Sequence, residues 1–219
     1  MLRKTAFCLL VFLMSTPLVF AEDSIESLMA KGNAWLQKKE YDKAIGEYEQ
    51  ALKLNEKNVV IHLVLGLAYA NAKQADKAIE HATRAVELDP NYYSYYNLGL
   101  VHASNEEAEK AIEAFDKAIE KSPGSYQAYY QKGLMYTSLK EYEKALEAHN
   151  HAIELNAYFA VAYLASAGPA YRLGKRDEVM KQIEKLKSIG RIDLAVGLEK
   201  WVQDQDKGAN AGQPQAPAS

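Results

Sequence analysis

The sequence predicts an all-α protein made of repeated helical units. Its clearest segment, Glu107–Pro123, reads EAEKAIEAFDKAIEKSP, with alanine, isoleucine and phenylalanine at steps of three and four. This spacing places the apolar residues on one face of a helix, and charged residues fill the other face. A Lys-Ala-Ile or Lys-Ala-Leu triplet stands at the same position of four units, beginning at Lys43, Lys77, Lys110 and Lys144. We therefore expect a row of similar helices.

Three columns of small residues share one repeat spacing. Four glycines lie 34, 33 and 34 residues apart, at Gly32, Gly66, Gly99 and Gly133. Two alanine columns follow the same steps, at Ala44, Ala78, Ala111 and Ala145 and at Ala51, Ala85, Ala118 and Ala152. Small residues in register let two helices approach closely where they cross. The one short step falls between Pro90 and Gly99, so we expect a shortened turn at Asp89–Tyr93 or just after it.

The third unit carries a pattern of aromatic, Leu, Gly, Ala, aromatic, Ala and Pro, held by Tyr95, Leu98, Gly99, Ala111, Phe115, Ala118 and Pro123. This pattern resembles the tetratricopeptide repeat family, whose unit of about 34 residues is a helix pair. The match covers most of the chain, although the second unit has Ala82 in its second aromatic position. The resemblance implies an all-α, right-handed superhelical solenoid of antiparallel helix pairs, with about five units and a C-terminal capping helix.

The units follow one another along residues 22–205. Four regular units span residues 25–58, 59–91, 92–125 and 126–159, and Ser24 is the expected N-cap of the first helix. The fifth, residues 160–190, is degenerate: Ala167 replaces the repeated glycine, and Gly168-Pro169 is expected to interrupt its first helix with a kink near Ser166–Gly168. Residues 191–205 read as an amphipathic capping helix, and residues 206–219 as a disordered tail.

Residues 1–21 have the features of a secretory signal peptide. Arg3 and Lys4 precede an apolar run, and small residues before Glu22 suit cleavage after Ala21. An uncleaved membrane anchor is the alternative, but the apolar run is shorter than the roughly 20 residues that a spanning helix needs. The only cysteine, Cys8, lies inside this segment, so the mature chain would contain no disulfide. We expect export to the periplasm of a Gram-negative bacterium, with no membrane insertion after cleavage.

Composition and motifs argue against several function classes. The formal net charge is −3, and it becomes −5 without residues 1–21, because Arg3 and Lys4 leave and 24 bases then face 29 acids. A nucleic-acid-binding face needs excess positive charge, so we expect no nucleic-acid partner. The sequence shows no catalytic motif, and its five histidines are spaced as structural or surface residues. We therefore expect no enzyme activity, no cofactor and no metal site.

Function is then expected to come from a surface. In the resembling family, the first helices of successive units line a concave groove that receives a partner segment. The expected groove columns lie six and three residues before each repeated glycine and one and four residues after it, and they begin with Glu26 in the first unit. The candidate groove residues in these columns are Met29, Asn33, Leu63, Leu67, Tyr93, Tyr96, Leu100, Tyr130, Leu134 and Tyr171. Asn33 fits the family's carboxylate clamp, but Met29 stands where the first clamp lysine would be. An apolar or amphipathic partner segment is therefore expected, with Tyr93, Tyr96 and Tyr130 as anchors. The alternative is that individual tyrosines pack between units.

Two functions share this expectation. The first is a non-catalytic adaptor or assembly scaffold of the bacterial cell envelope that binds a protein or peptide partner. The second is a holdase-like periplasmic chaperone that uses the same groove for unfolded exported chains. Enzyme activity or glycan binding through the tyrosine-rich surface is the remaining alternative. A homo-oligomer is compatible with each function, and the sequence names no partner.

Overall fold

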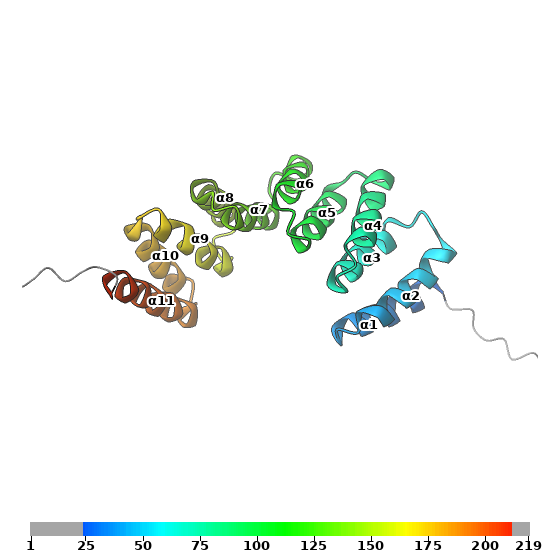
Figure 1. Cartoon of the computed structure of the whole chain (residues 1–219), viewed down its shortest axis with the longest axis horizontal. Helices are drawn as coiled ribbons and strands as arrows, with labels where there is room; N and C mark the ends of the chain where they lie inside the picture. Colours follow the sequence, from blue (N-terminus) through cyan, green and yellow to red (C-terminus); the bar gives the residue numbers. More distant parts are fainter. Residues whose placement is uncertain (1–23, 212–219) are drawn as a thin grey trace, which may run out of the picture.

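The helices of the chain are arranged in an arc (Figure 1). The computed structural model describes residues 24–211, with side chains through residue 207. These residues form α1 (Ile25–Gln37), α2 (Tyr41–Leu54), α3 (Val59–Asn71), α4 (Ala75–Leu88), α5 (Tyr92–Ser104), α6 (Ala108–Lys121), α7 (Tyr126–Ser138), α8 (Tyr142–Leu155), α9 (Ala160–Arg172), α10 (Arg176–Ser188) and α11 (Ile192–Ala211). Each helix packs against the next one in the chain. The predicted all-α solenoid of helix pairs is confirmed.

The helix ends follow a repeated pattern. The Oγ atom of Ser24 accepts a hydrogen bond from the backbone N–H of Ser27 at 3.2 Å, so the predicted N-cap is confirmed. Side chains of Asn58, Asn91 and Ser125 cap α3, α5 and α7 in the same way. The second helices of the four regular units have no side-chain cap. They follow a tight turn instead.

That turn contains a residue in the left-handed backbone region. The residues there have φ near 60° in the four regular units and 70° in the fifth, and they are Lys39, Lys73, Glu106, Lys140 and Gly174. A side chain beyond glycine is strained in this region. The turn is nevertheless kept, because its backbone N–H groups bond the carbonyls that end the first helix, as Lys39 does with Leu36 at 2.9 Å.

The repeated glycines are needed where the two helices of a unit cross. A Cβ atom at Gly32 would collide with the ring of Tyr48, and one at Gly99 would lie 2.5 Å from a ring carbon of Phe115. In the second unit, Ala82 leaves space that Asn97 of α5 fills, and its Nδ2 donates to the carbonyl of Leu63 at 3.0 Å. In the first and third units, the aromatic ring of the second helix and the glycine of the first helix therefore set the distance between the two helices.

The shortened step lies where it was predicted. Only Asp89, Pro90 and Asn91 connect α4 to α5, whereas residues 55–58, 122–125 and 156–159 make the three equivalent connections. The backbone N–H of Asn91 bonds the carbonyl of Asp89 at 2.8 Å, which closes this tighter turn.

The C-terminal part differs from two expectations. The predicted interruption of the fifth unit's first helix is wrong, because α9 is one continuous helix with Pro169 inside it. Pro169 and its neighbour Ala170 are both fully buried. A bend there stays a prediction. The predicted end of the capping helix at residue 205 is also wrong, since α11 continues to Ala211. Tyr171 of α9 and Arg176 of α10 both donate hydrogen bonds to the carboxylate of Asp206, and these contacts hold the C-terminal part of α11 against the fifth unit.

Two further expectations fall on residues that the structure does not describe. The signal peptide of residues 1–21 lies outside the described residues, and so do residues 212–219 of the expected tail. Within residues 24–211, no helix combines the length and the apolar character that crossing a membrane requires.

Candidate functional site

The candidate groove residues all belong to the inner layer of the solenoid. The first helices of the units, α1, α3, α5, α7 and α9, follow the inner side of the arc (Figure 1). Successive inner helices contact one another, α3 with α5, α5 with α7 and α7 with α9. We call this inner side the concave face.

Exposure divides the predicted groove columns. The column six residues before each glycine is open to solvent, with Val60 57%, Tyr93 69% and Val161 41% exposed. In the columns three residues before and one residue after the glycine, most side chains are half-buried. The half-buried residues are Met29, Leu63, Tyr96, Tyr130, Leu67, Leu100 and Leu134. Large apolar side chains with this exposure combine a packed base with a free upper surface, as expected for a binding groove.

The three predicted tyrosine anchors have different surroundings. Tyr93 is exposed, and its ring packs edge-to-face with that of Tyr92 at 5.2 Å between ring centroids. Tyr96 stacks on Tyr92 with 5.5 Å between ring centroids, and its ring packs at a tilt against Phe115 with 5.7 Å between centroids. Burial raises the pKa of the Tyr96 hydroxyl. Tyr96 therefore also packs within the fold, whereas Tyr93 is available to a partner.

Tyr130 is also shared between the fold and the concave face. Its ring meets Phe159 edge-on at 5.1 Å and His149 at 5.7 Å. It links the fourth unit to the turn before the fifth. Its truncation would thus disturb packing as well as any groove.

Two other predicted residues already have partners in the protein. The Oδ1 atom of Asn33 accepts a hydrogen bond from the Tyr48 hydroxyl at 2.7 Å. Tyr171 packs edge-on against Trp201 at 5.3 Å and donates to Asp206 at 3.0 Å. These contacts secure the ends of the solenoid, and a groove role for either residue stays a prediction.

The concave columns carry almost no charge. Glu26, in the first turn of α1, is the one ionisable carboxylate among the predicted positions, and backbone and Ser24 hydrogen bonds lower its pKa. The remaining positions are aliphatic, aromatic or neutral polar. Away from Glu26, a charged partner side chain would find no counter-charge in these columns, so they suit an uncharged or apolar segment.

An apolar pocket opens at the C-terminal end of this face. It has a volume of about 510 Å³ and lies between α7, α9 and α11. The residues that line it are Leu134, Thr137, Leu164, Ala165, Ala167, Gly168, Pro169, Asp193, Leu194, Gly197, Leu198 and Trp201. Leu134 is a predicted groove residue, so the pocket adjoins the predicted groove. Its only charged lining residue, Asp193, is paired with Arg191 at 3.0 Å.

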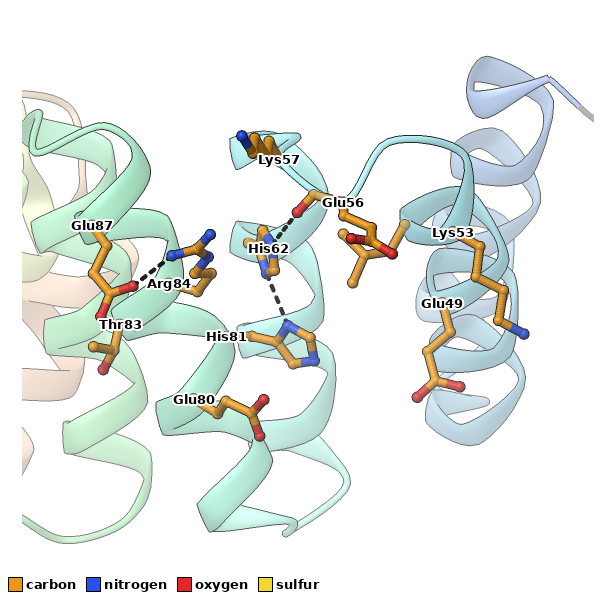
Figure 2. Close-up of a pocket in the computed structure, with 11 residues that line it drawn as sticks. Glu49, Lys53, Glu56, Lys57, His62, Glu80, His81, Thr83, Arg84 and Glu87 are labelled. Atoms are coloured by element: carbon orange, nitrogen blue, oxygen red, sulfur yellow. Dashed lines mark hydrogen bonds and ion pairs between the residues drawn. The ribbon is translucent and has the colours of Figure 1, made fainter.

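A second, polar pocket of about 790 Å³ lies between α2, α3 and α4 (Figure 2). His62 of α3 and His81 of α4 face each other there, with 3.0 Å between their Nδ1 atoms. The Nε2 atom of His62 is 3.0 Å from the carbonyl oxygen of Glu56. Because a carbonyl only accepts, neutral His62 carries its proton on Nε2, and His81 donates from Nδ1.

Burial, followed by the nearby His62, lowers the pKa of His81, which favours its neutral form. Tyr69 stacks on His81 at 5.4 Å and donates its hydroxyl proton to Glu49. The pair therefore joins α3 to α4 as a structural contact. Within the described part of the chain, no three His, Cys, Asp or Glu side chains gather as metal ligands.

The other histidines have separate roles. His102 bonds Glu107 at 2.6 Å, and exposed His151 lies 3.2 Å from Glu154. His149 is fully buried, and neither ring nitrogen has a hydrogen-bond partner. It fills the position that Phe115 fills one unit earlier, against Gly133. Sequence reasoning missed this equivalence, although the spacing of 34 residues from Phe115 to His149 carried the signal.

Comparison with known proteins identifies the repeats. Family models described as tetratricopeptide repeat or TPR repeat match residues 32–73, 63–126 and 126–159. The crystal structure of MamA protein is similar over 88% of this chain and 98% of that chain, with 30% sequence identity and a TM-score of 0.62. The chain belongs to the tetratricopeptide repeat family.

Curated relatives share a shorter segment. Small glutamine-rich tetratricopeptide repeat-containing protein 2 of Saccharomyces cerevisiae is 31% identical over 72 residues, or 33% of this chain and 21% of that protein. The heat shock protein sti1 homolog of Schizosaccharomyces pombe is 39% identical over 67 residues, or 31% of this chain and 11% of that protein. The chain thus spans about a tenth to a fifth of the length of these relatives. Proteins of the family bind other proteins through such repeats.

Proposed function

We propose that this protein is a non-catalytic adaptor or assembly scaffold of the bacterial cell envelope, which holds a segment of a partner protein on its concave face. The observation that carries the proposal is the apolar and aromatic character of the concave columns on the inner helices, in which Glu26 is the one charged residue. Tyr93 at its centre is 69% exposed although it is large and mostly apolar. Such a surface is costly to leave in water and is typical of a peptide-binding groove.

The partner segment is expected to be apolar or amphipathic. The half-buried leucines Leu67 and Leu100 offer contact area without charge, and Tyr93 adds a ring and a hydroxyl group. A stripe of this kind suits a helix or an extended strand that presents one apolar face. The family's acidic-peptide clamp is a poorer fit, because Met29 stands at the first clamp lysine and Asn33 is bonded to Tyr48.

The test is affinity capture from periplasmic and membrane fractions with the residue 22–219 chain, followed by mass spectrometry. We expect one dominant partner. Leu100→Arg should release it, because a charge would then face the partner's apolar surface. Lys117→Ala, an exposed change on outer helix α6, is the matched control. Loss of capture by both variants, or by neither, would contradict the groove assignment.

The second candidate is a holdase-like chaperone for exported proteins. It is favoured by the chaperone-associated name of the sti1 homolog among the relatives. A holdase should suppress aggregation of unrelated unfolded proteins at equimolar amounts. An adaptor should leave their aggregation unchanged while binding its one partner.

Export is part of the proposal and has its own test. Cell fractionation with amino-terminal sequencing should find the chain in the periplasm, beginning at Glu22. A chain that begins at Met1 in the membrane fraction would instead be a tethered scaffold.

A further inference from the structure

We propose that the apolar pocket between α7, α9 and α11 receives a large uncharged side chain of the partner segment, such as leucine, methionine or phenylalanine. The inference rests on the proposed function and deepens it, since it assigns the place where the partner is anchored. It differs from the sequence-based expectation, which placed the anchors at tyrosines of the central units.

The pocket exists because a groove side chain is missing. In the first four units, the residue after the repeated glycine is Asn33, Leu67, Leu100 or Leu134. The fifth unit has Ala167 in the glycine position, and Gly168 follows it. Where the other inner helices carry a side chain, α9 therefore carries none, and the space opens toward α11.

A second glycine lines the same space. Gly197 lies inside α11, and a Cβ atom at Gly168 or at Gly197 would meet nothing within 4 Å. Glycine inside a helix is destabilising relative to alanine, so it is normally explained by a close neighbour. Neither glycine has one. Two helix-interior glycines thus leave room that the fold itself does not use.

The chemistry of the pocket indicates the class of group that it can hold, and its size leaves room for that group. A volume of about 510 Å³ is within the usual range for ligand pockets, roughly 300–1,000 Å³. Its walls include Leu134, Leu164, Leu198 and the ring of Trp201. The only charged residue in the lining, Asp193, is exposed and paired with Arg191, so the apolar walls themselves offer a charged tip no counter-ion. An apolar side chain fits, and it enters from the concave face, beside Leu134.

The test uses peptides and a single-tryptophan protein. Trp35 and Trp201 are the two tryptophans, so Trp35→Phe leaves the pocket residue as the only indole. Peptides are selected on this protein from a random 12-residue library, and the enriched peptide is synthesised and titrated while the emission of Trp201 is followed. We expect enriched peptides to share one large apolar residue and to shift the emission to shorter wavelength.

Filling the pocket should remove this binding. Gly168→Leu and Gly197→Leu each place a side chain in the open space and should weaken the peptide at least tenfold. Gly46→Leu is the matched control, because Gly46 is also inside a helix with no neighbour within 4 Å but lies in α2. All three changes add helix-forming side chains, so midpoints of thermal unfolding at or above that of the parent protein would show that the variants fold.

The outcomes separate the two proposals. A peptide that Leu100→Arg releases but that still binds Gly168→Leu within twofold would overturn the pocket and leave the groove. A peptide unaffected by either change, or no enrichment at all, would overturn both. Self-association that Gly168→Leu abolishes would assign the pocket to a second copy. Emission shifts with decanoate and not with peptide would assign it to a lipid. Either result would overturn the partner assignment.

Discussion

Replacement of His149 by phenylalanine is expected to stabilise the protein and to flatten its acid sensitivity. His149 is fully buried, its two ring nitrogens have no hydrogen-bond partner, and burial lowers its pKa to about 4 from 6.5. The third unit shows that phenylalanine fits this position, since Phe115 packs on Gly99 as His149 packs on Gly133. The change removes unpaired polar atoms and adds apolar area.

Two magnitudes follow from this environment. A buried polar group without a partner costs about 1–3 kcal/mol, so the phenylalanine variant should gain an amount in that range at pH 7. In the wild type, the unfolded chain takes up a proton more readily than the folded chain between pH 6.5 and about 4. The free energy of unfolding should therefore fall as the pH decreases through this window, by about 3 kcal/mol in total at about 1.4 kcal/mol per pH unit.

The assay is urea unfolding, followed by circular dichroism, at several pH values from 4 to 8. The free energy of unfolding of His149→Phe should exceed that of the wild type at every pH, and the difference should increase toward pH 4. His151→Phe is the matched control, because His151 is half exposed and lies on a different face of α8. A phenylalanine variant that is less stable than the wild type, or that loses stability with acid just as steeply, would refute the reasoning.

Three further predictions concern other elements. Lys140→Gly should raise the free energy of unfolding by about 0.5–1 kcal/mol in thermal melts, because Lys140 has φ 61°. Tyr96→Ala should cost about 2 kcal/mol in urea unfolding, whereas exposed Tyr93→Ala should stay within about 0.5 kcal/mol; equal losses would contradict the burial difference. Asp206→Ala should speed hydrogen exchange at the C-terminal end of α11 while changing global stability by less than about 1 kcal/mol, and unchanged exchange would show that the contacts with Tyr171 do not hold this end.

The regular units could be predicted from the sequence because each repeat carries its own boundary signals. Asn91 caps a helix, and the ring of Phe115 requires glycine at position 99, so a local pattern and one contact define a unit. The missing residue between Pro90 and Gly99 was placed by the same register. The helix cap, the glycine–ring contact and the shortened connection all depend on residues no more than about 34 positions apart, so the repeat spacing is enough to predict them.

The C-terminal features could not be predicted in the same way. The extension of α11 depends on Arg176 and Tyr171 reaching Asp206, a contact across 30 and 35 residues between elements that do not repeat. The pocket likewise depends on how α11 packs against α9, which periodicity does not specify. Gly168-Pro169 was therefore interpreted as a break in a helix, although the helix continues and the glycine opens a space.

The inner helices also show why groove residues are hard to separate from core residues in a sequence. α3 reads VVIHLVLGLAYAN and is apolar on every side, because one face packs on α4, another contacts α5 and a third faces the concave side. Apolar spacing alone cannot distinguish these three uses. Exposure does distinguish them: Leu65 is fully buried, Leu67 is half-buried and Val60 is 57% exposed. A substitution that tests binding should therefore be chosen by exposure along a column. Changes at Val60 or Tyr93 should alter partner affinity at nearly constant stability, and changes at Leu65 should alter stability first.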